Sequence, residues 1–186
     1  RRISVTSGVY TNVPEGVGSA EGILVNVPPV ESWGVHFVLT PISTKSCGYI
    51  YRVLSGNVIT TLEISNIGSV TLSPSDMYEG DVATEIMITI QSDNPVLVVK
   101  YQKGYHACST RGDPSMTVES PVALYYGNVT FPVFETTWGG TKHYSVNVIA
   151  NCNDVDTLFL DGSTSLAIWD KLIVGSMCCL RGEVSP

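Results

Sequence analysis

Histidines, cysteines and carboxylates are the side chains with which this 186-residue chain could do covalent or acid–base chemistry. A catalytic site needs a nucleophile, a base within hydrogen-bonding reach and a group that orients the base. His106 lies two residues before Cys108, whereas His36 and His143 lie in runs typical of strands. The sequence contains no motif of serine hydrolases, zinc proteases, phosphate-binding loops or dinucleotide-binding turns, and its carboxylates are not paired. We therefore predict that the protein is not an enzyme.

The five cysteines favour disulfide chemistry over metal binding. They form no Cys-x-x-Cys pair and no Cys/His spacing of the zinc type. An odd number leaves at least one thiol free, or bonded to another segment or molecule. The adjacent pair near the end of the chain suits cross-linking better than core packing, although buried and inert thiols of an intracellular protein are the alternative. The disulfide candidates are Cys47, Cys108, Cys152, Cys178 and Cys179.

Oxygen ligands gather in one acidic stretch that contains Asp154, Asp156 and Asp161. A hard cation such as calcium is bound by carboxylate and carbonyl oxygens. The spacing does not match an EF-hand loop, and alternating Asp and Asn beside a turn is also typical of turn formation. We therefore predict no cofactor, with calcium as the one ion that these residues could bind.

A tripeptide that integrins recognise, Arg111-Gly112-Asp113, is present once. Such a triplet works when a loop presents a guanidinium and a carboxylate on either side of a flexible glycine. The following residue is Pro114, which restricts Asp113 to extended conformations and removes the next amide donor. Cell attachment through this triplet is therefore an alternative function.

The single N-glycosylation sequon is Asn128-Val129-Thr130. It falls in a strand-like run, so a glycan there requires the Asn128 side chain to face solvent. Two nearby segments with aromatic and glycine residues, Tyr125-Tyr126-Gly127 and Trp138-Gly139-Gly140, are candidate contact loops. The alternative is that their aromatic side chains belong to the core beside ordinary turns.

Composition indicates which elements must position these side chains. The chain is rich in Val, Ile and Thr and poor in strong helix formers, so strands should dominate. Its 44% hydrophobic and 15% charged residues can form a core, and no run of about 18 apolar residues could span a membrane. The net charge is −7 and the basic residues are scattered. We therefore expect neither nucleic acid binding nor membrane insertion.

Period-two alternation divides the chain into about a dozen short strands with no convincing helix. Turn signals such as Asp93-Asn94-Pro95 and Asp161-Gly162 separate them, and only residues 74–78 could form a helical turn. The expected fold is all-β and β-sandwich-like, with a β-propeller segment as the alternative. The expected strands are 3–6, 23–27, 35–39, 49–54, 58–64, 85–90, 96–101, 129–134, 144–149, 157–160, 166–169 and 172–174.

Some segments recur at an offset of about 93 residues, for example 28–30 and 120–122. This offset predicts two packed repeats, residues 1–93 and 94–186. The alternative is that the similarity reflects sequence patterns common to strands and turns in all-β proteins. No Pro-, Ser- or Gly-rich linker separates the halves, so residues 1–186 should form one β domain or a fragment of it.

Several ordered motifs resemble one known family. Residues 27–34 read Val-Pro-Pro-Val-Glu-Ser-Trp-Gly and residues 112–116 read Gly-Asp-Pro-Ser-Met. Together with residues 3–8, 11–17, 35–37, 51–54, 92–98, 101–104 and 160–162, they resemble the IgGFc-binding protein N-terminal domain family over nearly the whole chain. One departure is that Tyr10, Ser19 and Ala20 stand where relatives usually carry a cysteine pair. The pattern also begins partway into such a domain, which suggests a piece of a longer chain.

The resemblance implies a secreted, non-catalytic module of mucus and matrix proteins. Its expected role is structural or adhesive, and its expected partners are other extracellular proteins or copies of itself. Immunoglobulin binding belongs to the family's name, but no residue here can be assigned to it. A lectin-like or calcium-dependent binding module and an integrin ligand are the alternatives.

Overall fold

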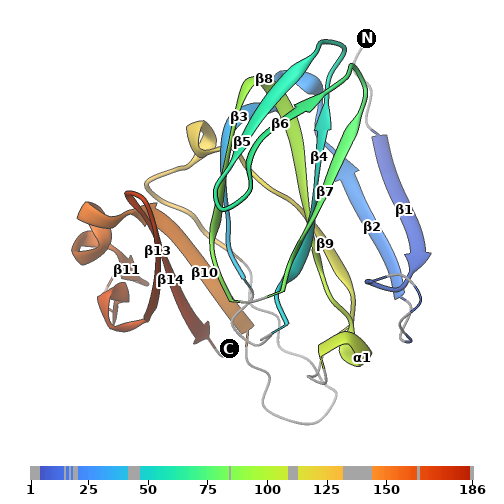
Figure 1. The fold of residues 1–186 in the computed structure, drawn as a ribbon. Helices are drawn as coiled ribbons and strands as arrows, with labels where there is room; N and C mark the ends of the chain where they lie inside the picture. The colour runs from blue at the N-terminus through green and yellow to red at the C-terminus, as the bar shows by residue number, and fades with distance from the viewer. Residues whose placement is uncertain are drawn as a thin grey trace.

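Antiparallel strands form most of the molecule (Figure 1). The structure, a computed structural model, describes residues 5–14, 16, 18, 21–41, 47–83, 85–108, 113–131, 144–162 and 164–184. Strands account for 55% of the residues, which confirms the all-β prediction. The strands are β1 Val5–Thr11, β2 Glu21–Val27, β3 Gly34–Leu39, β4 Tyr49–Ser55, β5 Thr60–Ile64, β6 Gly68–Leu72, β7 Met77–Val82, β8 Ile88–Gln102, β9 Ser115–Val118, β10 Tyr144–Asn151, β11 Phe159–Leu160, β12 Thr164–Ser165, β13 Asp170–Val174 and β14 Met177–Val184. The helical segments are η1 Val30–Ser32, α1 Tyr105–Cys108, η2 Val122–Leu124, η3 Cys152–Thr157 and η4 Leu166–Ile168.

The central sheet has seven strands and is organised around β8. Its main order is β6-β5-β8-β4-β7, and β3 and β9 also pair with β8. The first half of β8 pairs mainly with β3 and β5, and the second half with β4 and β9. One long strand therefore joins the two sides of a curled sheet, and the boundary of the proposed repeat between residues 93 and 94 lies inside it.

The turn predicted at Asp93-Asn94-Pro95 is wrong, because these residues lie within β8. The pairing with β3 shifts register here, as in a β-bulge, and a bulge tolerates a proline without an amide proton. The Asp93 carboxylate accepts a hydrogen bond from the Thr61 amide at 2.8 Å, and the Asn94 side chain donates to Ile59 O at 3.1 Å. Turn-forming side chains thus tie the bulge to the start of β5.

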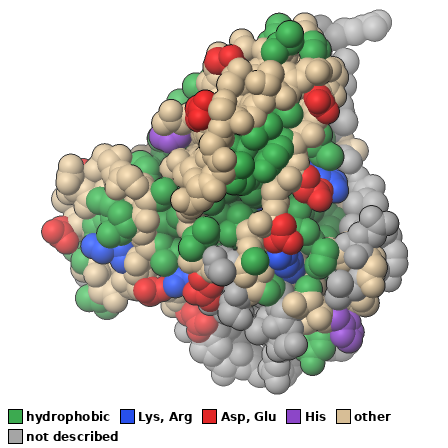
Figure 2. Space-filling model, viewed as in Figure 1, with side chains coloured by type: hydrophobic (Ala, Val, Ile, Leu, Met, Phe, Trp, Pro, Cys, Tyr) green, Lys and Arg blue, Asp and Glu red, His purple; other side chains and the backbone are tan. Residues whose placement is uncertain are grey.

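The main core lies inside the curled sheet, and alternating burial along β4 shows its inward face. Tyr49 and Tyr51 are fully buried there, and the Tyr51 ring lies across Gly80 of β7. Half-buried Val70 of β6 and Tyr78 of β7 pack against the same core, and Figure 2 shows hydrophobic side chains over these strands. The hairpin of β1 and β2 forms a separate sheet, and apolar side chains of β2 line a cavity with β4, β8 and β9.

A second, three-stranded sheet has the order β10-β14-β13. Its central strand β14 sends Cys178 and Leu180 into one apolar cluster and Cys179 into another, which also holds Val38 of β3. The Asn147 side chain of β10 donates to Thr40 Oγ1 at 2.9 Å and to Pro41 O at 2.7 Å. Apolar packing and these hydrogen bonds therefore join the second sheet to the end of β3.

Three expected elements differ in the structure. Residues 74–78 form a turn and the start of β7 instead of a helical turn. Residues 166–169 hold the short 3-10 helix η4, whose first turn is capped by the Ser165 hydroxyl accepting from the Ala167 amide. Residues 129–131 form no strand, and 132–134 lie outside the described residues.

Candidate binding groove beside β10

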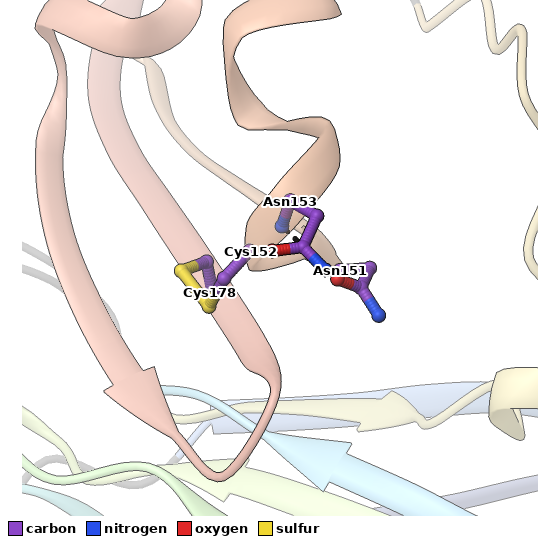
Figure 3. Close-up of a disulfide and its surroundings, with 4 residues drawn as sticks. All are labelled: Asn151, Cys152, Asn153 and Cys178. Atoms are coloured by element: carbon purple, nitrogen blue, oxygen red, sulfur yellow. Dashed lines mark hydrogen bonds between the residues drawn. A yellow bond between two sulfur atoms is a disulfide. The ribbon is translucent and has the colours of Figure 1, made fainter.

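One disulfide joins Cys152, at the start of η3, to Cys178 in β14 (Figure 3). The two Cα atoms are 4.9 Å apart, and the Asn151 side chain accepts a hydrogen bond from the Asn153 amide beside them. The disulfide fastens the irregular segment after β10 to β14, the central strand of the second sheet. Cys47 is also disulfide-bonded, and the side chain of Cys108 lies outside the described part of the chain.

Cys179 is a buried free thiol. Burial is the main reason why its pKa is raised to about 11, against smaller opposing effects of Arg181 and Thr40. The thiol is therefore neutral at pH 7 and unsuited to act as a nucleophile. Of the adjacent pair expected to cross-link, Cys178 does so within the chain and Cys179 packs in the core.

The three candidate calcium ligands lie in turns. The Thr157 hydroxyl donates to Asp154 O at 2.7 Å within η3, next to Asp156. Asp161 and Gly162 have positive φ angles of 50° and 71° and form the connection between β11 and β12. Across the described ranges, no three His, Cys, Asp or Glu side chains cluster as a metal site.

The remaining sequence candidates are scattered. Arg111 and Gly112 lie outside the described residues, whereas Asp113 is exposed directly before buried Pro114 and β9. His106 is exposed on α1 and stacks edge-on against Tyr105, with 5.1 Å between ring centres. His36 is half-buried in β3, and residues 138–140 and 143 lie outside the described part.

A groove of about 880 Å³ runs between β10 and the segment that follows β9. In Figure 1 the segment after η2 passes alongside β10. Side chains from both faces of β10 line the groove, which places it along the edge of the strand. We call it the β10 groove, and its lining residues are 117–120, 124–131, 146–149, 158–162, 166, 169 and 184.

β10 is an edge strand, because among the described strands it pairs only with β14. Its eight residues, Tyr144–Asn151, include no charged residue and no proline. Edge strands are usually protected by such residues, and β13 at the other edge of the same sheet carries Asp170 and Lys171. The buried Asn147 Oδ1 atom, in the groove lining, has no hydrogen-bond partner in the described part of the molecule. In the described part of the chain no second strand pairs with the outer edge of β10, so an added extended segment can pair with the backbone there.

The opposite wall of the groove is largely apolar and exposed. Tyr126 is 77% exposed and Val129 is 67% exposed. Phe159 on β11 also lines the groove and is 55% exposed. Asn128, the sequon asparagine, is exposed between them and also lines the groove. The sequence identified Tyr126 and Asn128 but missed Asn147 and Phe159, because no local pattern indicates which strand will lie at the edge of a sheet.

A buried ion pair fixes the start of this wall. Lys100 Nζ of β8 lies 3.0 Å from Glu119 Oε1 and donates to Thr40 O at 3.1 Å. Burial first, and then the negative charge of Glu119, raise the pKa of Tyr125 to about 12. The groove therefore joins a wall attached to the central sheet to an edge of the second sheet.

Comparison with known proteins adds one finding. The family model described as IgGFc binding protein matches residues 1–179 of the chain. No curated protein and no solved structure matches it. The match confirms the resemblance noted from the ordered sequence motifs, and it covers the central sheet and most of the second sheet, ending inside β14. The chain therefore belongs to the IgGFc binding protein family.

Proposed function

We propose that the protein is a non-catalytic structural or adhesive module of a larger secreted matrix, mucus or fibre protein, and that the β10 groove is its contact surface. Membership of the family indicates an extracellular binding module of the mucin-associated type. None of the helices in the described ranges has the length and apolar character needed to cross a bilayer.

The observation that carries the proposal is that an uncharged strand edge, with no partner strand in the described part of the chain, and an exposed apolar wall face the same groove. An extended segment of a partner can hydrogen-bond to the backbone of an edge strand and place alternate side chains against an apolar surface. The backbone hydrogen bonds supply affinity that depends little on sequence, and the wall selects the side chains. Such a site suits adhesion between proteins.

Two partners can be tested first. The family's name makes the Fc fragment of immunoglobulin G the first probe. A second copy of the chain is the other, because a free edge strand can pair with an identical strand by two-fold symmetry. Both are extracellular proteins, in agreement with the class of partner that the family indicates.

The test compares groove variants with a matched surface variant. Val129→Asp and Phe159→Asp place a charge on exposed positions of the groove wall, so neither should unfold the protein. Ile67→Asp, at a position 52% exposed outside the groove lining, is the control. Binding to immobilised Fc and self-association are measured by surface plasmon resonance and analytical ultracentrifugation. We expect the unaltered protein to bind Fc, to self-associate, or both. Only the groove variants should weaken the interaction, by about tenfold or more. Absence of both, or equal binding by all variants, contradicts the proposal.

Two rival functions give different results. A calcium-dependent module should lose stability in a chelator, because an ion bound only to the folded state stabilises it. An integrin ligand should lose cell attachment when Asp113 is changed to Glu. We expect neither change, since the proposed contact surface rests on a strand edge and an apolar wall and does not include Asp113.

A further inference from the structure

Tyr126, Asn128 and Thr130 stand at alternate positions of the segment that borders the β10 groove. In this order they are an aromatic residue, the acceptor asparagine of the sequon and the hydroxyl residue of the sequon. The described chain has no regular structure here and bends at Gly127, between the ring and the acceptor. An irregular, exposed segment is accessible to a modifying enzyme in a way that a paired strand is not.

The side chains of Asn128 and Tyr126 make few contacts with the rest of the described chain. Asn128 is exposed and forms no hydrogen bond with the described residues, and Tyr126 exposes 77% of its surface. An exposed tyrosine ring presents an apolar face to water, which is unfavourable unless something covers it. A sugar ring has an apolar face of C–H groups that can stack on an aromatic ring while its hydroxyl groups stay in water.

We propose that Asn128 carries an N-linked glycan whose first sugar stacks on the Tyr126 ring, so that the β10 edge and the Val129 and Phe159 side chains are the part of the groove left open to a partner. The donor is a lipid-linked oligosaccharide of the secretory pathway. The Asn128 amide nitrogen bonds to C1 of the first N-acetylglucosamine, the bond from C1 to the pyrophosphate oxygen breaks, the lipid pyrophosphate leaves and the amide gives up one proton. The glycan thus acts as a structural part of the module as well as a solubilising group.

The inference rests on the secretion that the proposed function includes, but it does not depend on any partner of the groove. Its readouts are the modification itself and the stability of the isolated protein. A groove that binds neither Fc nor a second copy leaves the glycan contact unaffected, so failure of one proposal is distinguishable from failure of the other.

The test begins with the protein secreted from a eukaryotic cell line. Peptide mass spectrometry should find a glycan on Asn128, should find none in Thr130→Ala, and should find it again in Thr130→Ser, which keeps the sequon. A bare Asn128 in the secreted protein overturns the inference at this stage.

The contact with Tyr126 is then measured by a double-mutant cycle. We expect the glycosylated protein to unfold about 2–4 °C higher than Asn128→Gln, which is the range expected for one modest interaction in a chain of this size. Trimming the glycan to one N-acetylglucosamine should preserve this gain. Tyr126→Phe should keep it and Tyr126→Ala should abolish it, while Tyr126→Ala in the Asn128→Gln background should have little effect because the side chain is exposed. A glycan that stabilises Tyr126→Ala as much as the unaltered protein overturns the stacking.

Discussion

Lys100 and Glu119 form an ion pair in which both side chains are largely buried. Their side chains are only 10% and 12% exposed, and Lys100 reaches Thr40 O as well as the carboxylate. A buried charge without its partner keeps its full desolvation penalty. The pair therefore fixes the end of β9 against β8, which places the start of the groove wall.

Replacing Glu119 by Gln should lower the free energy of unfolding by about 3–5 kcal/mol, because Lys100 then remains buried without an opposite charge. Glu79→Gln is the matched control, since the pair of Arg52 and Glu79 is 42% and 47% exposed at a distance of 2.6 Å. We expect the control to lose less than about 1 kcal/mol. Urea denaturation of both variants measures the difference, and equal losses would show that the buried pair has no special role.

Cys179 should make stability depend on alkaline pH. Its pKa is raised by burial to about 11 from an ordinary value of 9.0, so the folded state favours the neutral thiol. The contribution of this neutral thiol to the free energy of unfolding is therefore complete below pH 9 and is lost as pH rises from 9 towards 11. At pH 10 the protein should be about 1 kcal/mol less stable than at pH 8 from this group alone.

The control for this titration is Cys179→Ala, which removes the thiol. We expect the variant to have a smaller decrease in stability between pH 8 and pH 10 than the unaltered protein, as followed by urea denaturation at each pH. Parallel decreases in the two proteins would assign the alkaline loss to other groups, such as the buried tyrosines.

At the scale of elements, the strands on one side of a core could be predicted well and others not at all. Alternation in the sequence predicts a strand at 49–54, and in β4 the side chains do alternate between buried and partly exposed. β14 was missed, since it packs against apolar clusters on both faces and its consecutive Cys178, Cys179 and Leu180 show no alternation. The edge position of β10 depends on sheet order, which no local pattern encodes.

Gly80 illustrates how closely two strands must fit. A Cβ atom at this position would lie 2.3 Å from the Tyr51 ring, whereas one at Gly56 would meet nothing within 4 Å. Gly80→Ala should therefore destabilise the protein by about 1–3 kcal/mol through overpacking, and Gly56→Ala should be nearly neutral. Thermal unfolding of the two variants distinguishes them, and a neutral Gly80→Ala would mean that Tyr51 can move aside.

The disulfide between Cys152 and Cys178 should stabilise the second sheet more than the central one. It closes a segment with a sequence separation of 26 residues, which includes η3, η4 and β13. The double variant Cys152→Ala/Cys178→Ala should lose about 2–4 kcal/mol. Hydrogen exchange should increase first in β13 and β14, and a uniform increase across β4 and β8 would contradict a local effect.

The whole molecule combines a closed core with open sheet edges among its described strands, and the edge at β10 borders a groove. The central sheet buries its apolar side chains among β3 to β8, and the second sheet is held to it through Val38, Met87 and Cys179. In the second sheet, β10 has an unpaired edge among the described strands and faces an exposed apolar wall. Composition and family membership could indicate an extracellular β module, but only the fold locates the surface that would bind a partner.

The most direct test is hydrogen exchange, measured by mass spectrometry on the whole module, alone at low and high concentration and with saturating Fc fragment. If the β10 groove is the contact surface, the amides of Tyr144–Asn151 and of residues 124–131 will become protected in at least one of these conditions. The amides of β6, another strand with one unpaired edge among the described strands, should be unchanged. Protection confined to β6 or to other surfaces, or no protection in any condition, would contradict the assignment of the groove as the binding site.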